Sequence, residues 1–186
     1  MRVICCLGNP GAEYARTRHN VGWLVADVLA ARHGIELSRR RMRALFGRGT
    51  IQGQDVLLVK PQTFMNDSGD AARRIVQFYK IAREDFIAVY DDSALELGVI
   101  RLRPGGSDAG HKGMRSLATH LQTQQIARLR LGVGMPPPGM DARSWVLSEF
   151  KPSERERVQE MVERAADALE CWLAEGLETA MSRFNG

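Results

Sequence analysis

The sequence predicts an α/β fold: a single domain over residues 1–186, arranged as a three-layer sandwich in which a twisted mixed sheet carries helices on both faces. Short apolar runs alternate with segments of helical periodicity along the chain, which is typical of this class. Residues 49–53 and 55–59 have the pattern of two strands joined at residues 53–54, and such a hairpin adds an antiparallel pair to the sheet. With 186 residues, of which 44% are hydrophobic, the chain can bury one substantial core.

The first predicted strand, residues 3–7, ends abruptly at the Gly-Asn-Pro-Gly segment 8–11. Two glycines and a proline in such a loop allow unusual backbone angles and a close approach to a ligand. His19 follows this loop, and Asn20 is placed to cap a helix over residues 21–34. A degenerate dinucleotide-binding loop is the alternative, but the G-x-G-x-x-G spacing is missing. A polar loop with a histidine at the end of a buried strand predicts the floor of an active site.

Polar segments flank the predicted hairpin. The arginine run 39–41, with Arg43 and Arg48 close behind, indicates a solvated loop or strand edge or, on charge alone, a nucleic-acid contact. After the hairpin, residues 60–69 form a polar loop that leads into a helix. Within it Asn66 has the position of a simple N-cap, which the local context favours over a ligand contact.

Arginines and glycines mark the second half of the chain. Residues 98–103 alternate apolar and basic side chains, which places Arg101 and Arg103 on one face of a strand. The glycine-rich segment 104–113 leads into a helix, and the free backbone N–H groups at a helix N-terminus suit anion binding. Residues 127–134 form a further alternating strand.

The last third of the chain carries structural signals. Residues 136–139 are rich in proline and predict a mobile connector. A capping-box pattern, Ser153-x-x-Glu156, predicts the start of the final helix. One apolar stripe along residues 158–172 predicts core packing for that helix.

Charge and cysteine usage bound the possible partners. The 26 basic residues exceed the 22 acidic ones, which gives a net charge of +4. This charge favours an anionic partner, and a nucleic acid rather than a membrane. A soluble basic protein without such a partner would explain the net charge equally well. Cys5 and Cys6 are adjacent in a predicted strand and face opposite ways, so they are poorly placed to pair. No metal-ligand spacing, signal peptide or membrane-spanning run is apparent, which predicts a reduced, cytoplasmic protein.

The chemistry-bearing side chains lie on three loops. The strand predicted over residues 86–90 ends at Asp91, and an aspartate and a histidine on separate strand-end loops can form a general base, here His19, and the carboxylate that orients it. No nucleophile motif such as G-x-S-x-G is present, which favours direct attack by water. One good donor to a developing oxyanion contributes roughly 3–4 kcal/mol. The candidate donors are Asn9, Asn66 and Lys112.

Taken together, the motifs resemble those of bacterial peptidyl-tRNA hydrolase. They occur in the order found in that family and span residues 3–150, and the terminal helix fits as well. A match of this length is highly specific. The blocks that carry the resemblance are Leu7-Gly-Asn-Pro-Gly-x-x-Tyr14-x-x-Thr17-Arg-His-Asn20 with Gly22, Lys60-Pro-x-Thr63-Phe-Met-Asn66-x-Ser68-Gly69, Asp91-Asp92 with Leu95 and Gly98, Gly105-Gly-Ser with Gly110-His111-x-Gly113, Leu129-Arg-Leu-Gly-Val-Gly134 and Trp145-Val-Leu-Ser-Glu-Phe150.

The resemblance implies a monomeric, cytoplasmic esterase without cofactor, metal or membrane partner, which cleaves the ester between the peptide and the 3′ end of the tRNA in peptidyl-tRNA. It implies that His19 is the general base that activates water and that Asp91 holds and polarises it, with no covalent intermediate. The implied substrate contacts are Asn9 and Asn66 to the peptide backbone beside the ester, Met65 and Tyr14 along the cleft, and Arg101, Arg103 and Arg130 to tRNA phosphates.

Two positions depart from the family pattern. Lys112 stands where the family most often has asparagine, and lysine can donate a hydrogen bond but cannot accept one. Ala94 replaces the usual second acidic residue after Asp91. A non-catalytic RNA-binding protein, like the splicing factors of the same fold family, is the competing hypothesis; the expected absence of a transit peptide and the full hydrolytic set argue against it. A nonspecific esterase would leave the arginines of residues 98–103 unexplained. The preferred peptidyl-tRNAs and the protonation state of His19 stay open.

Overall fold

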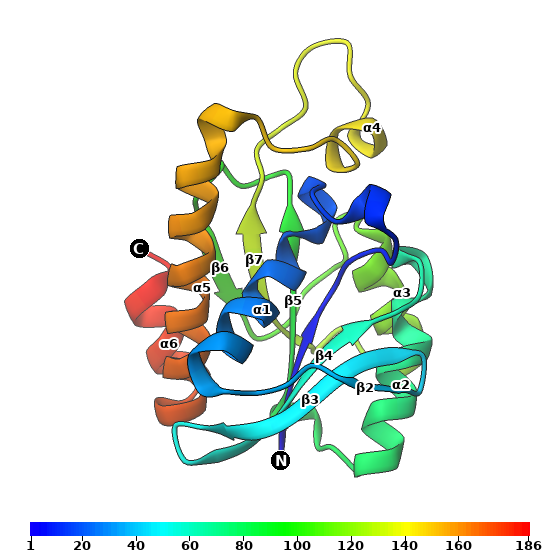
Figure 1. The fold of residues 1–186 in the computed structure, drawn as a ribbon, viewed down its shortest axis with the longest axis vertical. Coiled ribbons are helices and arrows are strands. Elements are labelled where there is room, and N and C mark those ends of the chain that lie inside the picture. Colours follow the sequence, from blue (N-terminus) through cyan, green and yellow to red (C-terminus); the bar gives the residue numbers. More distant parts are fainter.

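The computed structural model describes all residues 1–186 and contains one sheet of seven strands (Figure 1). The strands are β1 (Arg2–Cys6), β2 (Arg39–Arg41), β3 (Ala44–Ile51), β4 (Gln54–Pro61), β5 (Phe86–Asp92), β6 (Ile100–Arg103) and β7 (Ala127–Gly132). Their order is β2-β3-β4-β1-β5-β7-β6. The four central strands are parallel, whereas β2 and β3 at one edge and β6 at the other pair in the antiparallel sense. The predicted mixed sheet is confirmed.

Helices cover both faces of this sheet, as the three-layer prediction requires. The helices are α1 (Val21–His33), α2 (Ser68–Tyr79), α3 (Lys112–Leu121), α4 (Ala142–Val146), α5 (Arg155–Glu175) and α6 (Leu177–Phe184). Helices α1, α5 and α6 pack on one face, and α2 and α3 pack on the other. The short helix α4 stands apart from both layers, above the C-terminal ends of the parallel strands (Figure 1). None of the helices is long and apolar enough to cross a membrane.

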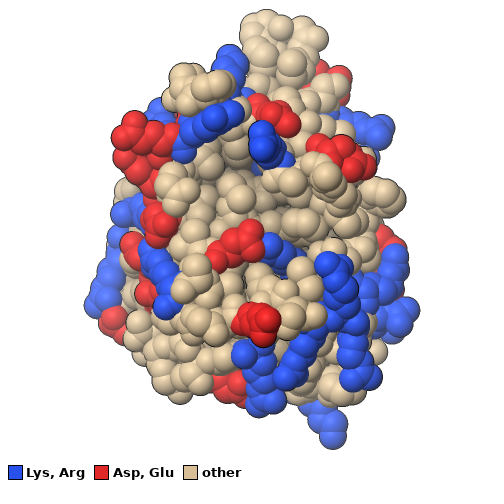
Figure 2. All heavy atoms as spheres, viewed as in Figure 1, with Lys and Arg blue, Asp and Glu red and all other residues tan.

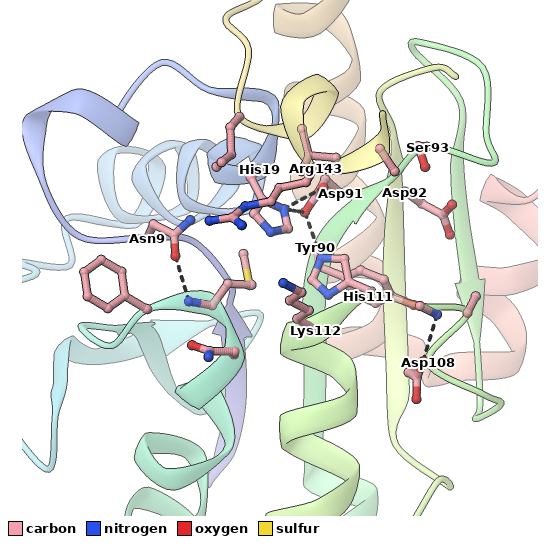
Figure 3. A pocket seen from close by; sticks show the side chains of 18 of the residues that line it. Asn9, His19, Tyr90, Asp91, Asp92, Ser93, Asp108, His111, Lys112 and Arg143 are labelled. Atoms are coloured by element: carbon pink, nitrogen blue, oxygen red, sulfur yellow. Dashed lines mark hydrogen bonds and ion pairs between the residues drawn. The ribbon is translucent and has the colours of Figure 1, made fainter. Parts of the chain in front are cut away.

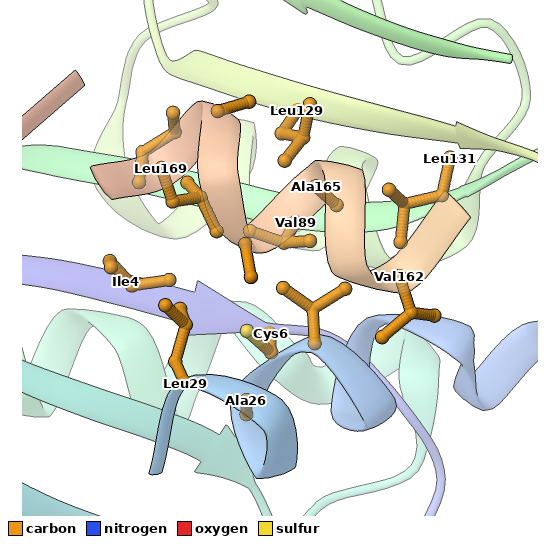
Figure 4. Packing of buried hydrophobic residues seen from close by; sticks show 14 of the residues in the cluster. Ile4, Cys6, Ala26, Leu29, Val89, Leu129, Leu131, Val162, Ala165 and Leu169 are labelled. Atoms are coloured by element: carbon orange, nitrogen blue, oxygen red, sulfur yellow. The ribbon is translucent and has the colours of Figure 1, made fainter. Parts of the chain in front are cut away.

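Two hydrophobic cores follow from strand alternation. Successive side chains of a strand point to opposite faces, so Cys6 joins the core under α1 and α5 while Cys5 joins the core under α2 and α3. In the first core Ile4 and Val89 from the sheet meet Leu29 of α1 (Figure 4). The adjacent cysteines are both buried and unpaired, as their opposed directions predict.

Three local predictions were wrong in detail. Strand β3 begins at Ala44, five residues earlier than predicted, because its apolar side chains pair with β4 over eight positions. Asn66 is not an N-cap: a 3-10 turn precedes α2, and the helix begins after Asp67. The capping contact before α5 joins Lys151 and Glu154, whose carboxylate accepts the Lys151 N–H at 2.7 Å, and not Ser153 and Glu156.

The sheet topology positions one crevice. After β1 the chain passes through α1, β2 and β3 to β4 on one side of β1, and after β4 it passes through α2 to β5 on the other side. A reversal of this kind opens a crevice at the carboxyl ends of the parallel strands. Helix α1 reaches close to this point because residue 22 is glycine. A Cβ at Gly22 would lie 2.7 Å from the carbonyl oxygen of Val89 and 2.9 Å from that of Leu7.

Candidate active site

A cleft with a volume of about 690 Å³ lies at the carboxyl ends of the parallel strands, as the topology predicts (Figure 3). It brings together most of the residues that the sequence singled out. The predicted site residues that line it are Asn9, Tyr14, His19, Met65, Asn66, Asp91 and Lys112. Residues that lie 80 or more positions apart in the chain therefore share one cavity, whereas the three predicted tRNA-contacting arginines are not among its lining residues.

A buried carboxylate between two imidazoles forms the centre of the cleft. Asp91, at the end of β5, is 1% exposed. Its two oxygens each lie 2.8 Å from Nδ1 of His19, and its Oδ1 also lies 2.9 Å from Nε2 of His111. Figure 3 shows both rings turned toward the carboxylate. The rings of the two histidines are themselves 5.1 Å apart between centroids.

Electrostatics keep this carboxylate ionised. Burial raises the pKa of Asp91, but the His19 and His111 imidazoles oppose that effect and hold the pKa well below its usual range. An ionised Asp91 can only accept hydrogen bonds, so Nδ1 of His19 carries the proton and donates it to the carboxylate. In the neutral imidazole Nε2 then carries the lone pair, and it has no hydrogen-bond partner in the protein. His19 can therefore accept a proton from a molecule in the cleft.

The amide of Asn9 is fixed by a relay of hydrogen bonds. The side chain of Asn20 accepts the Asn9 N–H at 2.9 Å and donates to the Asn9 carbonyl oxygen at 2.9 Å. Asn20 thus stands at the start of α1, as predicted, but its side chain clamps the Asn9 loop and makes no capping bond. The Asn9 Oδ1 accepts the backbone N–H of Met65 at 2.7 Å. Only the NH₂ group of Asn9 is left to donate into the cleft.

The mouth of the cleft combines aromatic and cationic side chains. Tyr14 and Phe64 make an edge-to-face contact with ring centroids 6.4 Å apart, and Phe64 is 61% exposed. Asn66 is exposed beside them. Lys112 opens α3, and Arg143 of α4 reaches across the cleft toward His19 (Figure 3). Neither Lys112 nor Arg143 has an ion-pair partner within 4 Å, so both are free to bind an anionic or carbonyl group.

The arginines predicted to contact tRNA form a group of their own beside the cleft. Arg101 of β6 lies opposite Arg130 of β7 in the antiparallel register, and Arg103 follows Arg101 on the same face. The Nε of Arg130 donates to Oδ2 of Asp92 at 2.7 Å, and Asp92 lines the cleft. The structure therefore places a positive strip next to Asp92 but outside the cavity.

The arginine run 39–41 is a strand edge, one of the two structural alternatives that its pattern suggested. It forms β2, whose three side chains are all exposed. Figure 2 shows basic side chains gathered over this side of the molecule, where β2, β3 and α2 lie. The strip of β6 and β7 occupies the opposite edge of the sheet.

Several site residues escaped the sequence analysis. His111 lies in a segment whose glycines indicate backbone anion binding, and nothing in that pattern signals a contact of its side chain with Asp91. Arg143 lies beyond the proline-rich connector, and no local pattern links it to the three earlier loops from which the site was predicted. Phe64 has only the signal of an aromatic in a polar loop. Each of these contacts depends on long-range packing that a local pattern does not encode.

This chain therefore has an α/β sheet with a crevice at its carboxyl edge, a histidine–carboxylate pair in that crevice, and amide and cationic donors around it. Fold and site together are typical of a hydrolase that activates water with histidine. The same three groups, His19, Asp91 and His111, are also the one set whose atoms, all within 4.8 Å of one another, could hold a metal ion. In the structure these atoms contact each other.

Comparison with known proteins identifies the family. The family model for peptidyl-tRNA hydrolase matches residues 3–186. A peptidyl-tRNA hydrolase of Caldanaerobacter subterraneus subsp. tengcongensis is 49% identical over 186 residues and covers 100% of both chains. That of Chloroflexus aggregans is 48% identical, covering 100% of this chain and 99% of the relative. The crystal structure of peptidyl-tRNA hydrolase from Acinetobacter baumannii matches with a TM-score of 0.94 at 34% identity, over 100% of this chain and 95% of that one. The chain belongs to the peptidyl-tRNA hydrolase family and is an enzyme that hydrolyses peptidyl-tRNA.

Proposed function

We propose that the cleft is the hydrolytic centre and that His19 is the general base that activates the attacking water. The observation that carries this assignment is the contact of His19 Nδ1 with both oxygens of Asp91 at 2.8 Å, which leaves Nε2 directed to the cleft. Asp91 holds the ring in one orientation and stabilises the imidazolium that forms during the reaction. We propose that residues 1–186 form a single domain that contains the whole hydrolytic centre.

The proposed reaction needs only water and protein side chains. Nε2 of His19 takes a proton from water while the water oxygen forms a bond to the ester carbonyl carbon. The tetrahedral intermediate then collapses, the bond between that carbon and the 3′ oxygen of the tRNA breaks, and the imidazolium returns the proton to this oxygen. The products are tRNA with a free 3′ hydroxyl and a peptide whose carboxyl group ionises in solution. An ester leaving group is weakly basic compared with an amide, so a positioned base suffices without a covalent intermediate.

Donors around His19 would bind the substrate carbonyl groups. The free NH₂ of Asn9 is the donor with the best-fixed position, because Asn20 and Met65 hold the rest of that residue. Asn66 and Lys112 lie at the cleft wall, where they would contact the peptide and the 3′ end. In this chain Lys112 supplies a positive charge where the family most often has an amide, so its contact would be to an oxygen that accepts.

The positive strip of Arg101, Arg103 and Arg130 would bind tRNA phosphates. Phosphate contacts position an RNA without reading its sequence, which suits an enzyme that accepts many tRNAs. The proposed base His19, its partner Asp91 and the donor Asn9 meet within a single chain, so the proposed reaction needs no second copy, and we propose a monomer as the active unit. The substrate is a product of translation, so we place the enzyme in the cytoplasm.

The test is the release of peptide from an N-blocked aminoacyl-tRNA by the purified protein and by the His19→Ala variant. We expect turnover by the wild type and near-complete loss in the variant, with tRNA binding retained. A matched control is His33→Ala, because His33, the last residue of α1, contacts Glu170 of α5 at 2.8 Å and lies outside the cleft. Wild-type turnover by His19→Ala would show that His19 is not the base.

A further inference from the structure

Arg18 is a buried cation that directly precedes His19. It is 1% exposed, and its guanidinium carbon lies 3.7 Å from the ring centroid of Trp145 and 4.9 Å from that of Phe150. Its Nη2 forms an ion pair with Glu154 at 3.0 Å. All of these partners belong to the segment that carries α4 and leads into α5. Arg18 therefore joins the loop of the proposed base to the segment above the cleft.

The backbone reinforces this junction. The N–H of Arg18 donates to the carbonyl oxygen of Ser148 at 2.9 Å, and its Nε donates to the Ser148 hydroxyl at 3.2 Å. Residues Thr17 and Glu149 form an isolated antiparallel bridge. Trp145, which covers the guanidinium, also donates its indole N–H to the carbonyl oxygen of Gly134 at 2.6 Å. The segment is thus held at its start through Trp145 and at its end through Glu154.

The held segment forms one wall of the cleft. Helix α4 and the residue after it contribute the lining residues Ala142, Arg143, Val146 and Leu147. Apart from the contacts at Trp145 and Ser148, α4 has little support: residues 135–144 are intermediate or exposed. The position of this wall, including the Arg143 cation near His19, therefore depends on the Arg18 junction (Figure 3).

Stability alone is a poor reason for this arrangement. Burying a charge is costly, and an apolar side chain of similar volume often serves the core as well. The Nη1 of Arg18 is buried without a hydrogen-bond partner, which adds to the cost. In return, the planar guanidinium fixes two aromatic faces and a carboxylate in one relative geometry, which a flexible apolar chain would not do.

We propose that Arg18 is a positioning residue, which holds α4 over the cleft and thereby sets the affinity for peptidyl-tRNA. The inference depends on the proposed function of the cleft. Without the guanidinium, α4 occupies its binding position in only a fraction of the molecules, and the apparent KM rises by the inverse of that fraction. At saturating substrate the bound state restores α4, and the contact between His19 and Asp91 is untouched. The substitution should therefore change KM and leave kcat nearly unchanged.

The experiment compares Arg18→Met with a matched control, Arg2→Met. Arg2 has the same kinds of contact, because it lies 5.0 Å from the ring centroid of Trp172 and forms an ion pair with Asp85 at 3.6 Å. It stands at the start of β1, at the end of the strand away from the cleft. We expect KM for an N-blocked aminoacyl-tRNA to rise roughly tenfold in Arg18→Met, with kcat within about threefold of wild type. Both constants should hold in Arg2→Met.

Hydrogen exchange supplies a readout that does not depend on turnover. The amides of residues 142–147 should exchange faster in Arg18→Met than in wild type and stay unchanged in Arg2→Met. If the role of Arg18 were only structural, the folded fraction would fall, kcat per total protein would fall with it and KM would not move. That result, or unchanged exchange at residues 142–147, overturns the proposal.

Two further variants cover the case in which Arg18→Met does not fold. Glu154→Gln removes the ion pair while Arg18 stays, and Trp145→Leu removes the aromatic face that covers the guanidinium. Each should raise KM by a smaller factor than Arg18→Met, and unchanged KM in both overturns the proposal. His19→Ala separates this inference from the proposed function. An active His19→Ala would refute the assignment of the base, whereas an inactive one beside an unchanged KM in the Arg18 series would refute only the role of Arg18.

Discussion

Nε2 of His111 lies 2.9 Å from Oδ1 of Asp91, so the carboxylate that orients His19 is shared between two imidazoles. His111 itself is held by the first turn of α3, because its Nδ1 accepts the Met114 N–H at 3.2 Å. With Nδ1 accepting, Nε2 carries the proton and donates it to Asp91. His111 therefore helps to hold the carboxylate that His19 contacts.

The variant His111→Phe should weaken catalysis without abolishing it. Phenylalanine keeps the ring but cannot donate to Asp91, and a hydrogen bond to a charged group contributes about 1.5–3 kcal/mol. We expect kcat/KM to fall roughly 10- to 100-fold, less than in His19→Ala. Peptide release under steady-state conditions measures the change. A loss as large as that of His19→Ala would mean that His111 acts on the substrate itself.

Asn9 can be tested with a pair of substitutions. Asn9→Asp keeps the oxygen that accepts the Met65 N–H but loses the donating NH₂ group, whereas Asn9→Ala loses both. If the donor stabilises the developing oxyanion, both variants should lose roughly 10²- to 10³-fold in kcat. Single-turnover peptide release measures this loss, with thermal unfolding as the control. Near-normal kcat in Asn9→Asp would instead show that Asn9 serves to hold the Met65 loop.

The sequence predicts the fold well because the determining signals are local. The short apolar run over β5 and the helical periodicity over α5 each identify an element, and the hairpin requires an antiparallel pair. The start of β3 at Ala44 and the true cap of α2 could not be predicted from local context, because pairing with β4 and a 3-10 turn decide them. Propensity is a weak guide wherever tertiary contacts compete with it.

In the candidate site too, some residues can be predicted from local signals and others cannot. His19, Asp91 and Asn9 follow buried strands or begin a helix, so topology alone brings them to one edge of the sheet. The contact of His111 with Asp91 and the junction of Arg18 with Trp145 depend on side-chain directions across segments far apart in the chain. Such contacts have no periodic signal. The sequence therefore predicts the chemistry of the cleft but not the groups that hold it in place.

The positive strip makes a prediction for salt dependence. Each phosphate contact contributes about 0.7–0.9 to the slope of log affinity against log salt concentration. Replacing Arg101 and Arg103 together by glutamine should lower that slope for kcat/KM by about 1.5. The matched control removes the same two charges through Arg39→Gln and Arg40→Gln, on the opposite edge strand β2, where both arginines are exposed and have no ion pair. An equal change in the control would mean that net charge, and not the strip, attracts the tRNA.

The pH profile of turnover tests the protonation state of the base. The proposed mechanism needs a neutral His19 imidazole, so kcat/KM should fall with a slope of one as acid protonates it. Asp91 stays ionised over that range. Burial raises its pKa, but the His19 and His111 imidazoles outweigh that effect and keep the pKa well below normal. Peptide release between about pH 5 and 8 gives the profile. A flat profile would argue against His19 as the base.

Asp70 makes the corresponding prediction for stability. Its carboxylate accepts from Arg43 at 2.7 Å and from Arg73 and Arg74 at 3.0 Å each. The Arg43 contact first, and then the other two, hold the pKa of Asp70 well below its usual range against the effect of burial. A carboxyl group whose pKa is lowered on folding stabilises the native state above its unfolded pKa of about 3.9, and this stabilisation is lost as the pH falls below that value.

Asp70→Asn should therefore lower the free energy of unfolding at pH 7 by about 1–2 kcal/mol, a modest value because the three guanidinium groups are partly exposed to solvent. The difference from wild type should shrink below about pH 4, because the Asp70 carboxyl group of the unfolded wild-type chain is protonated there while the native one stays ionised. Urea unfolding at both pH values measures it. Asp55→Asn is the control, since Asp55 pairs with Arg48 on the exposed surface and should change little at either pH. A difference that stays constant between the two pH values would mean that Asp70 stabilises the protein through packing and not through its charge.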